Sequence, residues 1–451
     1  MKTNRIVGFQ SGHDVAYCIL ENGVPIIHEE LERFTREKEP LGDGLKFFLE
    51  QNVDMEDVDY FTFGNPGGRS GKYKESCGNQ KSEDRMVEIL NNNMDRYYEF
   101  GHHQSHAANA FFSSNFDEAL IVTMDGGGIE KNGKATAFTV WTGKDTKINE
   151  VEVFPIGSLN IGSFWSKCTK HIFGLSTGYP YGHQAGTVMG MACLGKSKYS
   201  DDFYHALRKG HQIDYSYYKN LADENEQSKF DVAASLQEAT HRITKETMKP
   251  FVEKYNMKKL CLSGGVALNS VMVGQMYEWF EGIVDDIYID PIPYDGGLSL
   301  GSARYLWHHI LGNPRIEWKD NSSSYLGRTY GEEEIKKTLN NSLVDYEYVD
   351  DDKVVELRKS DNNVISVFGG GSESGRRALG NRSILADPRS PNMKDIINEK
   401  VKHRQWFRPF APSVLREDVK EWFDKDVDSP YMTSVIKFKE SVRNKVPAVV
   451  H

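Results

Sequence analysis

The sequence lacks long apolar runs, paired cysteines and an excess of positive charge. No stretch of about 18 apolar residues occurs, and residues 1–5 lead directly into a short apolar segment rather than into a signal peptide. The five cysteines are scattered without a Cys-x-x-Cys pair, so buried thiols are favoured over disulfides or a cysteine metal site. We therefore expect a cytoplasmic protein that does not bind a membrane.

Charge and length limit the function further. The formal net charge is -10 at pH 7, so there is no overall basic field of the kind that attracts nucleic acid. Local basic clusters can still bind small anions. A chain of 451 residues is too long for one hydrophobic core, and its 39% hydrophobic content is enough to build two or three domains.

The chain opens with three short apolar segments, at residues 5–9, 16–20 and 24–28. Asn22-Gly23 separates the last two and favours a hairpin, because both residues tolerate positive φ. Further strands are expected at 119–124, 136–142, 150–154, 259–262, 287–289 and 364–368, and helices at 266–280, after 297 and at 332–339. Strands that end in glycine turns, with helices between them, predict α/β layering. A domain boundary near residue 345 divides the chain into 1–345 and 346–451.

A pair of histidines is the first candidate for chemistry. His102 and His106 are four residues apart in a helix-compatible stretch, so both imidazoles share a helix face and can meet one cation. By spacing alone, surface histidines without a metal are favoured. Asp125 and Asp295 change this balance, because each follows a strand at a glycine turn, where α/β proteins place ligand-binding groups. Two histidines and two aspartates suit iron, manganese or zinc.

Glycine turns are the second candidate. They occur in Gly12-His13-Asp14, Asp125-Gly126-Gly127-Gly128 and Ser263-Gly264-Gly265. Each can present backbone N–H groups to a phosphate, and the last also opens a helix. One such turn is an ordinary connector. Three in this order, behind an opening hairpin, resemble the actin-like, sugar-kinase-like ATPase (ASKHA) fold.

Several strings resemble one family over residues 8–451. They read HHQSHA, VTMDGGG, SGGVALN and DPIPYDGGLSLGSA in the first part, and GRRALGNRSILADPRSP and NEKVKHRQWFRPFAPSVL in the second. These strings are similar to the O-carbamoyltransferases of nodulation-factor and antibiotic biosynthesis. The first domain of that family is similar to the threonylcarbamoyl-transferring subunit that modifies tRNA. Its second domain is YrdC-like, that is, similar to threonylcarbamoyl-adenylate synthases.

The resemblance implies a two-step reaction. The second domain would convert carbamoyl phosphate and ATP, with Mg²⁺, into a carbamoyl adenylate, and the first would pass the carbamoyl group to a hydroxyl of a small natural product. By motif position, the two histidines with Asp125 and Asp295 would bind a divalent metal, Fe²⁺ first and Mn²⁺ or Zn²⁺ as alternatives. His13 would be the general base, and its near-neutral reference pKa suits removal of a proton from an alcohol.

The resemblance also implies contacts to the co-substrates. Lys38, in ERFTREK, matches a lysine that would bind the adenylate, and Asn269 is expected at the nucleotide site with the glycine turns. Arg377, Lys402 and Arg408 are favoured as ligands of carbamoyl phosphate, because a forked guanidinium matches phosphate oxygens in pairs. A basic surface is the simpler alternative, but Arg408 stands among stiff apolar residues in FRPFAP.

The sequence departs from the family pattern at three places. Residues 185–187 lack a charged pair, residues 371–376 keep only Glu373 and Gly375, and family members continue beyond residue 451, so the second domain is expected to be incomplete. Two other functions stay open: an actin-like-fold kinase of a small metabolite, and a degenerate nucleotide-binding partner protein without catalysis. The kinase leaves the histidine pair and FRPFAP unexplained. A homodimer is considered as the assembly.

Overall fold

The computed structural model describes residues 4–51, 57–65, 92–175, 184–317, 324–359 and 363–451. The chain divides into two compact units, Met1–Ser323 and Ser324–His451. This division lies earlier than the boundary expected near residue 345. The functional domains 1–345 and 346–451 stay a prediction, because compactness alone does not define what each part does.

The first sheet of unit 1 has the strand order β3-β2-β1-β4-β5. Its strands are β1 (Arg5–Gln10), β2 (Ala16–Glu21), β3 (Val24–Glu30), β4 (Tyr60–Phe63) and β5 (Tyr97–Glu99). The first three form the expected antiparallel hairpins, and Asn22 has the positive φ that the turn requires. β4 and β5 add parallel strands. They were not predicted, because segments of 4 and 3 residues show no periodicity.

The second sheet repeats this topology with the order β10-β9-β6-β7-β8. Its strands are β6 (Glu118–Ile129), β7 (Ala135–Lys144), β8 (Lys147–Pro155), β9 (Lys259–Ser263) and β10 (Asp286–Ile289). As in the first sheet, three strands are antiparallel to one another, and two parallel strands extend the sheet from the first of them. This duplicated arrangement is that of the actin-like ATPase fold, so the fold class predicted for the first domain is confirmed.

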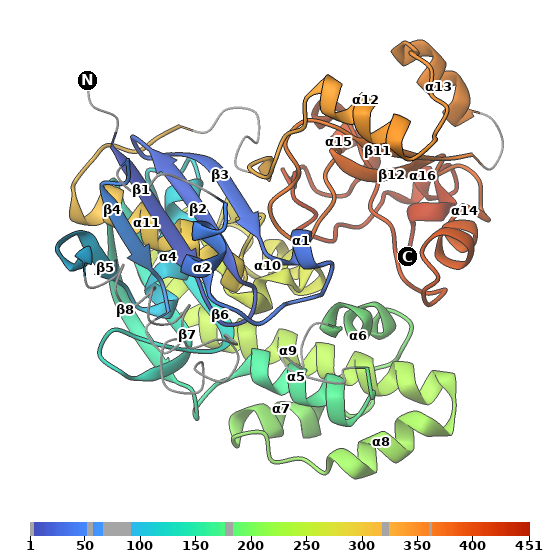
Figure 1. Cartoon of the computed structure of the whole chain (residues 1–451). Coiled ribbons are helices and arrows are strands. Elements are labelled where there is room, and N and C mark those ends of the chain that lie inside the picture. Colours follow the sequence, from blue (N-terminus) through green and yellow to red (C-terminus); the bar gives the residue numbers. More distant parts are fainter. Residues whose placement is uncertain (1–3, 52–56, 66–91, 176–183, 318–323, 360–362) are drawn as a thin grey trace. The chain divides into compact units, whose positions relative to one another are not determined.

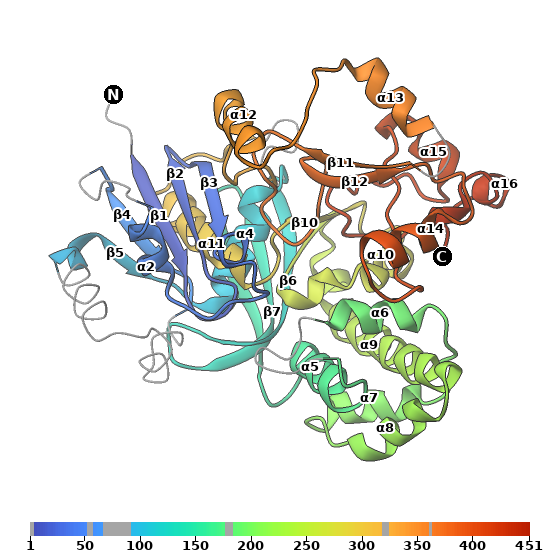
Figure 2. The same ribbon diagram turned by 45° about the vertical axis from the view of Figure 1, so that its right-hand side comes forward.

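Two helices lie between the sheets (Figure 2). α4 (His102–Ser113) packs on β6 and β9, whereas α11 (Leu298–Arg304) packs on β1 and β4, and the two helices contact each other. The helix contact is close, because a Cβ atom at Gly301 would lie 2.0 Å from the carbonyl oxygen of Ser105. The glycine at position 301 therefore allows α4 and α11 to approach each other this closely.

A helical region follows β8 (Figure 1). It contains α5 (Ile161–His171), α6 (Ala185–Ala192), α7 (Ser200–Arg208), α8 (Tyr215–Glu224) and the long α9 (Glu226–Tyr255). The prediction of one helix over 266–280 was wrong in its start. A 3-10 turn, Gly265–Leu268, precedes α10 (Ser270–Trp279), because the Asn269 side chain accepts the Met272 N–H at 3.1 Å and caps α10 there.

Unit 2 contains a two-stranded antiparallel sheet, in which β11 (Val364–Phe368) pairs with β12 (Arg382–Ala386). The expected helix near 332–339 is α12 (Glu332–Asn341), and α13 (Asp351–Lys359) and α14 (Met393–Ile396) follow. A small core forms around Met393, Ile397 and Ala448.

Helix hydropathy and cysteine burial can both be read from the described residues. No helix among them combines the length and the apolar character that a membrane crossing needs. Cys18, Cys168 and Cys261 are buried free thiols, whereas Cys193 is exposed. The predicted preference for buried thiols therefore holds for three of these four cysteines.

Candidate metal centre and active site

Four residues predicted as metal ligands meet in one cluster. They are His102 and His106 of α4, Asp125 within β6, and Asp295 in the turn before α11. One ligand atom from each lies within 4.8 Å of the others. His106 Nε2 lies 3.4 Å from Asp125 Oδ2 and 3.5 Å from Asp295 Oδ1, and His102 Nε2 lies 3.7 Å from Asp295 Oδ1. The structure thus brings together the four residues that the sequence suggested.

The two histidines are buried, with 1% exposure for His102 and 0% for His106. The alternative of surface histidines is therefore excluded for this pair. Among the described residues, neither ring nitrogen of His102 nor Nε2 of His106 has a hydrogen-bond partner. A buried nitrogen without a partner costs free energy, which a cation accepting its lone pair would remove. The orphan nitrogens and the two carboxylates fit a divalent metal with nitrogen and oxygen ligands.

The charges of the cluster also favour a cation. Burial opposes protonation of His106, but the Asp125 and Asp295 carboxylates outweigh it and raise its pKa to about 9. Burial favours the neutral form of both carboxyls, yet the neighbouring imidazoles hold the pKa of Asp125 and of Asp295 below their ordinary values. In the metal-free protein one proton on His106 therefore balances part of the negative charge. A divalent cation, which binds the deprotonated ring nitrogen, would replace this proton and balance more of the charge.

Backbone groups of two glycine turns orient Asp125. The N–H groups of Gly126 and Gly265 both donate to its carboxylate, the second at 2.6 Å. The N–H of Gly264 donates to the Pro293 carbonyl at 2.7 Å. In this arrangement three of the N–H groups expected to face a phosphate have protein acceptors. Phosphate contacts by these glycines, and by Gly127, stay predictions.

Sequence reasoning missed residues that place the metal ligands. A Cβ atom at Gly128 would lie 2.0 Å from Cγ of His102, so only glycine lets β6 approach that ring. On the opposite side, Tyr294, next to Asp295, donates its hydroxyl to buried Glu30 at the end of β3. The sequence does contain a sign of this role, because Glu30 is a carboxylate at the end of an apolar strand. A charged residue is seldom buried at such a position unless it has a partner.

His13 lies beside the cluster, in the turn between β1 and β2. Its Nε2 is 3.5 Å from Asp295 Oδ2, and its Nδ1 is 2.9 Å from Asp14 Oδ2. Asp14 has a φ of 54°, which is uncommon for a residue other than glycine and occurs often at functional turns. Burial lowers the pKa of His13, but Asp295 and Asp14 together raise it to about 10. With 30% of its side chain exposed, His13 is accessible to a substrate.

Two predicted nucleotide contacts have protein partners. Lys38 Nζ lies 2.5 Å from Glu32 Oε1, and 69% of the lysine side chain is exposed. Asn269 exchanges two hydrogen bonds with Gln237 of α9, at 3.1 and 3.0 Å, in addition to capping α10. Neither set of contacts involves the four-residue cluster. The nucleotide roles of Lys38 and Asn269 stay predictions.

A separate group of cations lies in unit 2. Burial, with repulsion from Arg404 and Arg408, lowers the pKa of Lys402, and burial with Arg408 lowers the pKa of Arg404 to about 10. Arg404 is held by Asn398, whose Oδ1 accepts its Nε–H at 2.7 Å. Within the described part of the chain, no carboxylate pairs with Lys402 or Arg408. Positive charge without a counterion favours an anionic ligand.

Arg377 lies in the loop between β11 and β12. Buried Glu373 orders this loop, since it accepts the N–H groups of Leu379 and Asn381 at 2.7 and 2.8 Å and Nε–H of Arg382 at 2.8 Å. The structure therefore explains why Glu373 is kept in a segment that otherwise departs from the family pattern. A common site for Arg377 with Lys402 and Arg408 stays a prediction.

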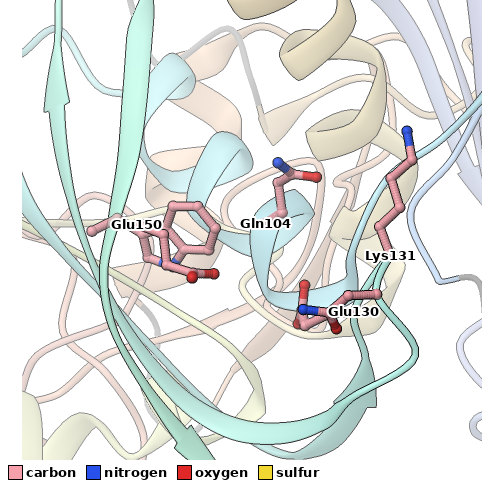
Figure 3. A pocket seen from close by; sticks show the side chains of 6 residues that line it. Gln104, Glu130, Lys131 and Glu150 are labelled. Carbon is pink, nitrogen blue, oxygen red and sulfur yellow. The ribbon is translucent and has the colours of Figure 1, made fainter.

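A pocket of about 440 Å³ lies beside the start of α4 and contains none of the predicted site residues. Figure 3 shows its walls, which are Gln104, Glu130, Lys131, Asn132, Trp141 and Glu150. Burial and the neighbouring Glu130 carboxylate raise the pKa of Glu150. Of these walls, Glu130 accepts the N–H of His103 in the first turn of α4 at 2.9 Å, and Trp141 donates its indole N–H to Thr139 at 2.6 Å.

Two family models match the chain. The carbamoyltransferase N-terminus model matches residues 85–304, and the carbamoyltransferase C-terminus model matches residues 358–451. The chain therefore belongs to the carbamoyltransferase family, as its strings predicted.

Relatives agree with this family. An uncharacterized protein of Synechocystis sp. is 30% identical over 96% of this chain and 78% of its own length. Nodulation protein NolO of Bradyrhizobium diazoefficiens is 34% identical over 78% of this chain and 65% of its own, and nodulation protein NolNO of Sinorhizobium fredii is 34% identical over 78% and 52%. The chain thus spans about half to two thirds of these two nodulation proteins.

Among solved structures, full-length HypF in its phosphate- and nucleotide-bound form is similar to part of this chain. The match has a TM-score of 0.42 and 15% identity, and covers 70% of this chain and 47% of that chain. Component A of the (R)-2-hydroxyglutaryl-CoA dehydratase from Acidaminococcus fermentans has a TM-score of 0.39 at 14% identity, with coverage of 68% of this chain and 99% of that chain. Likeness at this level carries no functional argument.

Proposed function

We propose that the protein is an O-carbamoyltransferase that uses carbamoyl phosphate and ATP and transfers the carbamoyl group to a hydroxyl of a small natural product. The family supports the type of transfer. One observation carries the location of the transfer: the four-residue cluster and His13 share Asp295, whose two oxygens face the histidines and the turn of β1 and β2. In this proposal Asp295 is both a metal ligand and the neighbour of His13, the proton acceptor.

The chain's own residues account for proton removal in this proposal. A divalent cation at His102, His106, Asp125 and Asp295, with Fe²⁺ first and Mn²⁺ or Zn²⁺ as alternatives, would supply a Lewis acid for the carbamoyl C=O. With a cation bound, Asp295 would attract the His13 proton less. His13 would then be neutral and would take the proton of the acceptor hydroxyl as its oxygen attacks the carbamoyl carbon and AMP leaves.

Activation is assigned to the second domain in the same proposal. Lys402, Arg408 and Arg377 would bind the phosphate oxygens of carbamoyl phosphate, and water would release inorganic phosphate and carbamate. A carbamate oxygen would then attack the α-phosphorus of ATP, bound with Mg²⁺, to give the carbamoyl adenylate and pyrophosphate. The lowered pKa of Lys402 beside other cations supports an anion there. Lys38, Asn269 and the glycine turns would contact the nucleotide in the first domain.

The test is a reaction with a defined product. The metal-loaded protein is incubated with ATP, carbamoyl phosphate and a panel of hydroxylated natural products, and mass spectrometry follows the carbamoylated acceptor and AMP. His13→Ala and Asp295→Ala should abolish the product, and unchanged activity of both variants would refute the site. A phosphorylated acceptor with ADP would support the kinase alternative, and ATP binding without any turnover would support the non-catalytic partner.

A further inference from the structure

The helix that carries both histidine ligands is held by hydrogen bonds on the side of the second sheet. α4 begins after Gly101, which has no side chain to cap it. Glu130, in the turn between β6 and β7, supplies the acceptor instead: its Oε1 accepts the N–H of His103 at 2.9 Å and the hydroxyl of Thr136 at 3.0 Å. A carboxylate at this end satisfies a free N–H and matches the helix dipole.

The close fit of Glu130 shows that this cap is specific. A Cβ atom at Gly101 would lie 2.0 Å from Glu130 Oε2, so glycine is needed there to admit the carboxylate. Glu130 is also 27 residues from His103 along the chain. The cap therefore joins the first turn of α4, which contains His102, to the β6–β7 turn.

A second set of hydrogen bonds fixes the rotation of α4. His103 Nε2 lies 3.2 Å from the carbonyl oxygen of Thr136, which only accepts, so Nε2 donates. Nδ1 of the neutral ring then accepts from the hydroxyl of Thr123 at 2.5 Å. Thr139 follows at 2.6 Å from Thr123, and Trp141 Nε1–H donates to Thr139 at 2.6 Å. Because the one hydroxyl hydrogen of Thr123 is donated to His103, Thr139 donates to Thr123, and every bond of this chain runs from Trp141 to His103.

This chain of bonds acts on the metal ligands through the helix. Successive residues of an α-helix are about 100° apart around its axis, so fixing the ring of His103 also fixes the directions of His102 and His106. The threonines and Trp141 are buried, so water competes little for their bonds. The outer end of the chain, Trp141, and the cap, Glu130, line the pocket of Figure 3.

We propose that Glu130 and Thr123 are positioning residues of the metal centre, which act through His103 and the start of α4 to aim His102 and His106 at the cation. The proposal rests on the metal site of the proposed function. Residues that orient metal ligands without binding the metal change affinity by roughly 10- to 100-fold when replaced.

Paired substitutions at Thr123 separate the hydrogen bond from packing. Thr123→Val removes the hydroxyl at nearly constant volume, whereas Thr123→Ser keeps the hydroxyl and loses the methyl group. The full chain, freed of metal by a chelator, is titrated with Co²⁺, whose absorption spectrum reports ligand geometry. Thr123→Val should weaken Co²⁺ binding roughly 10- to 100-fold and change the spectrum, and Thr123→Ser should retain wild-type binding and spectrum.

A second pair and a control complete the experiment. Glu130→Ala should weaken Co²⁺ binding as Thr123→Val does, and Glu130→Gln should restore it, since one amide oxygen can accept both bonds that Oε1 now accepts. Thr240→Val is the matched control. Its buried hydroxyl on α9 donates to the Leu236 carbonyl at 2.8 Å and accepts from Trp165 Nε1–H at 2.8 Å, and the variant should bind Co²⁺ like wild type.

The outcomes distinguish the two proposals. If the Val and Ser variants of Thr123 bind Co²⁺ alike, or if Thr240→Val weakens binding as much as Thr123→Val, the positioning role is refuted while the metal centre stands. If the wild-type chain binds no Co²⁺, or binds it as well after His106→Ala, the metal centre fails and the positioning role fails with it.

Discussion

Replacing Asp295 with asparagine should lower the pKa of His13 and weaken metal binding together. Asparagine keeps the shape of the side chain and removes a charge that lies 3.5 Å from His13 Nε2 and 3.5 Å from His106 Nε2. In the metal-free protein, Asp295 is the largest contribution that raises the pKa of His13, which reaches about 10 against the effect of burial. The variant therefore reports directly on the shared carboxylate.

Coulomb's law gives the size of the effect. Two unit charges 3.5 Å apart attract by about 4 to 5 kcal/mol at an effective dielectric constant of about 20, which equals a pKa difference of roughly three. Water at the partly exposed His13 ring reduces this difference. We therefore expect the pKa of His13 to fall from about 10 to roughly 7 or 8 in Asp295→Asn.

The assay is an NMR titration of the histidine rings in the metal-free full chain, with Glu150→Gln as a charge-removal control outside the cluster. Stability provides a second readout with a defined sign. Because the folded pKa of His13 is raised, its pairing stabilises the fold fully below the unfolded value of about 6.5 and loses this contribution as the pH rises through about 10. The stability difference between wild type and Asp295→Asn should narrow over that window. A His13 pKa that is equal in the two proteins would refute the pairing.

Three further predictions concern other parts of the structure. Gly128→Ala places a Cβ atom 2.0 Å from Cγ of His102 and should reduce Co²⁺ affinity by roughly tenfold or more in equilibrium dialysis; unchanged affinity would show that β6 can move away. Lys402→Ala and Arg408→Ala should raise KM for carbamoyl phosphate with little change in KM for ATP, and equal effects on both would contradict an anion site for the smaller substrate. Glu373→Ala leaves three partly buried backbone N–H groups and the Arg382 guanidinium without their acceptor and should cost about 3 kcal/mol in urea unfolding of unit 2, so a stability equal to wild type would refute its role in the loop.

The four-residue cluster could be predicted because its parts follow local rules. His102 and His106 share a helix face at four-residue spacing. Asp125 comes just after the part of β6 that pairs with β9, and Asp295 comes after β10. Because β6 and β10 both run parallel to β9, these two positions lie at the same edge of the sheet. The same rules gave the opening hairpins and the α/β class. Only the burial of the two histidines, which excludes the alternative of surface histidines, required the structure.

Other features of the site depend on contacts that no local pattern encodes. Gly126 and Gly265 resemble phosphate-binding turns in sequence, but their N–H groups donate to Asp125 once β6 and β9 are paired. Glu130 caps α4 only because the β6–β7 turn folds back onto the start of that helix. Asn269 was expected at the nucleotide, whereas its amide pairs with Gln237, 32 residues away. Each of these partners follows from tertiary packing rather than from spacing.

The packing of α4 and α11 gives the metal centre a mechanical consequence. α4 and Asp125 belong to the half of unit 1 built on the second sheet, whereas Asp295 leads into α11, which packs on the first sheet beside the His13 turn. A cation held by all four residues would therefore crosslink the two halves of unit 1. Without the cation the two halves should rotate more easily against each other, and such a rotation would change the distance between His13 and Asp295.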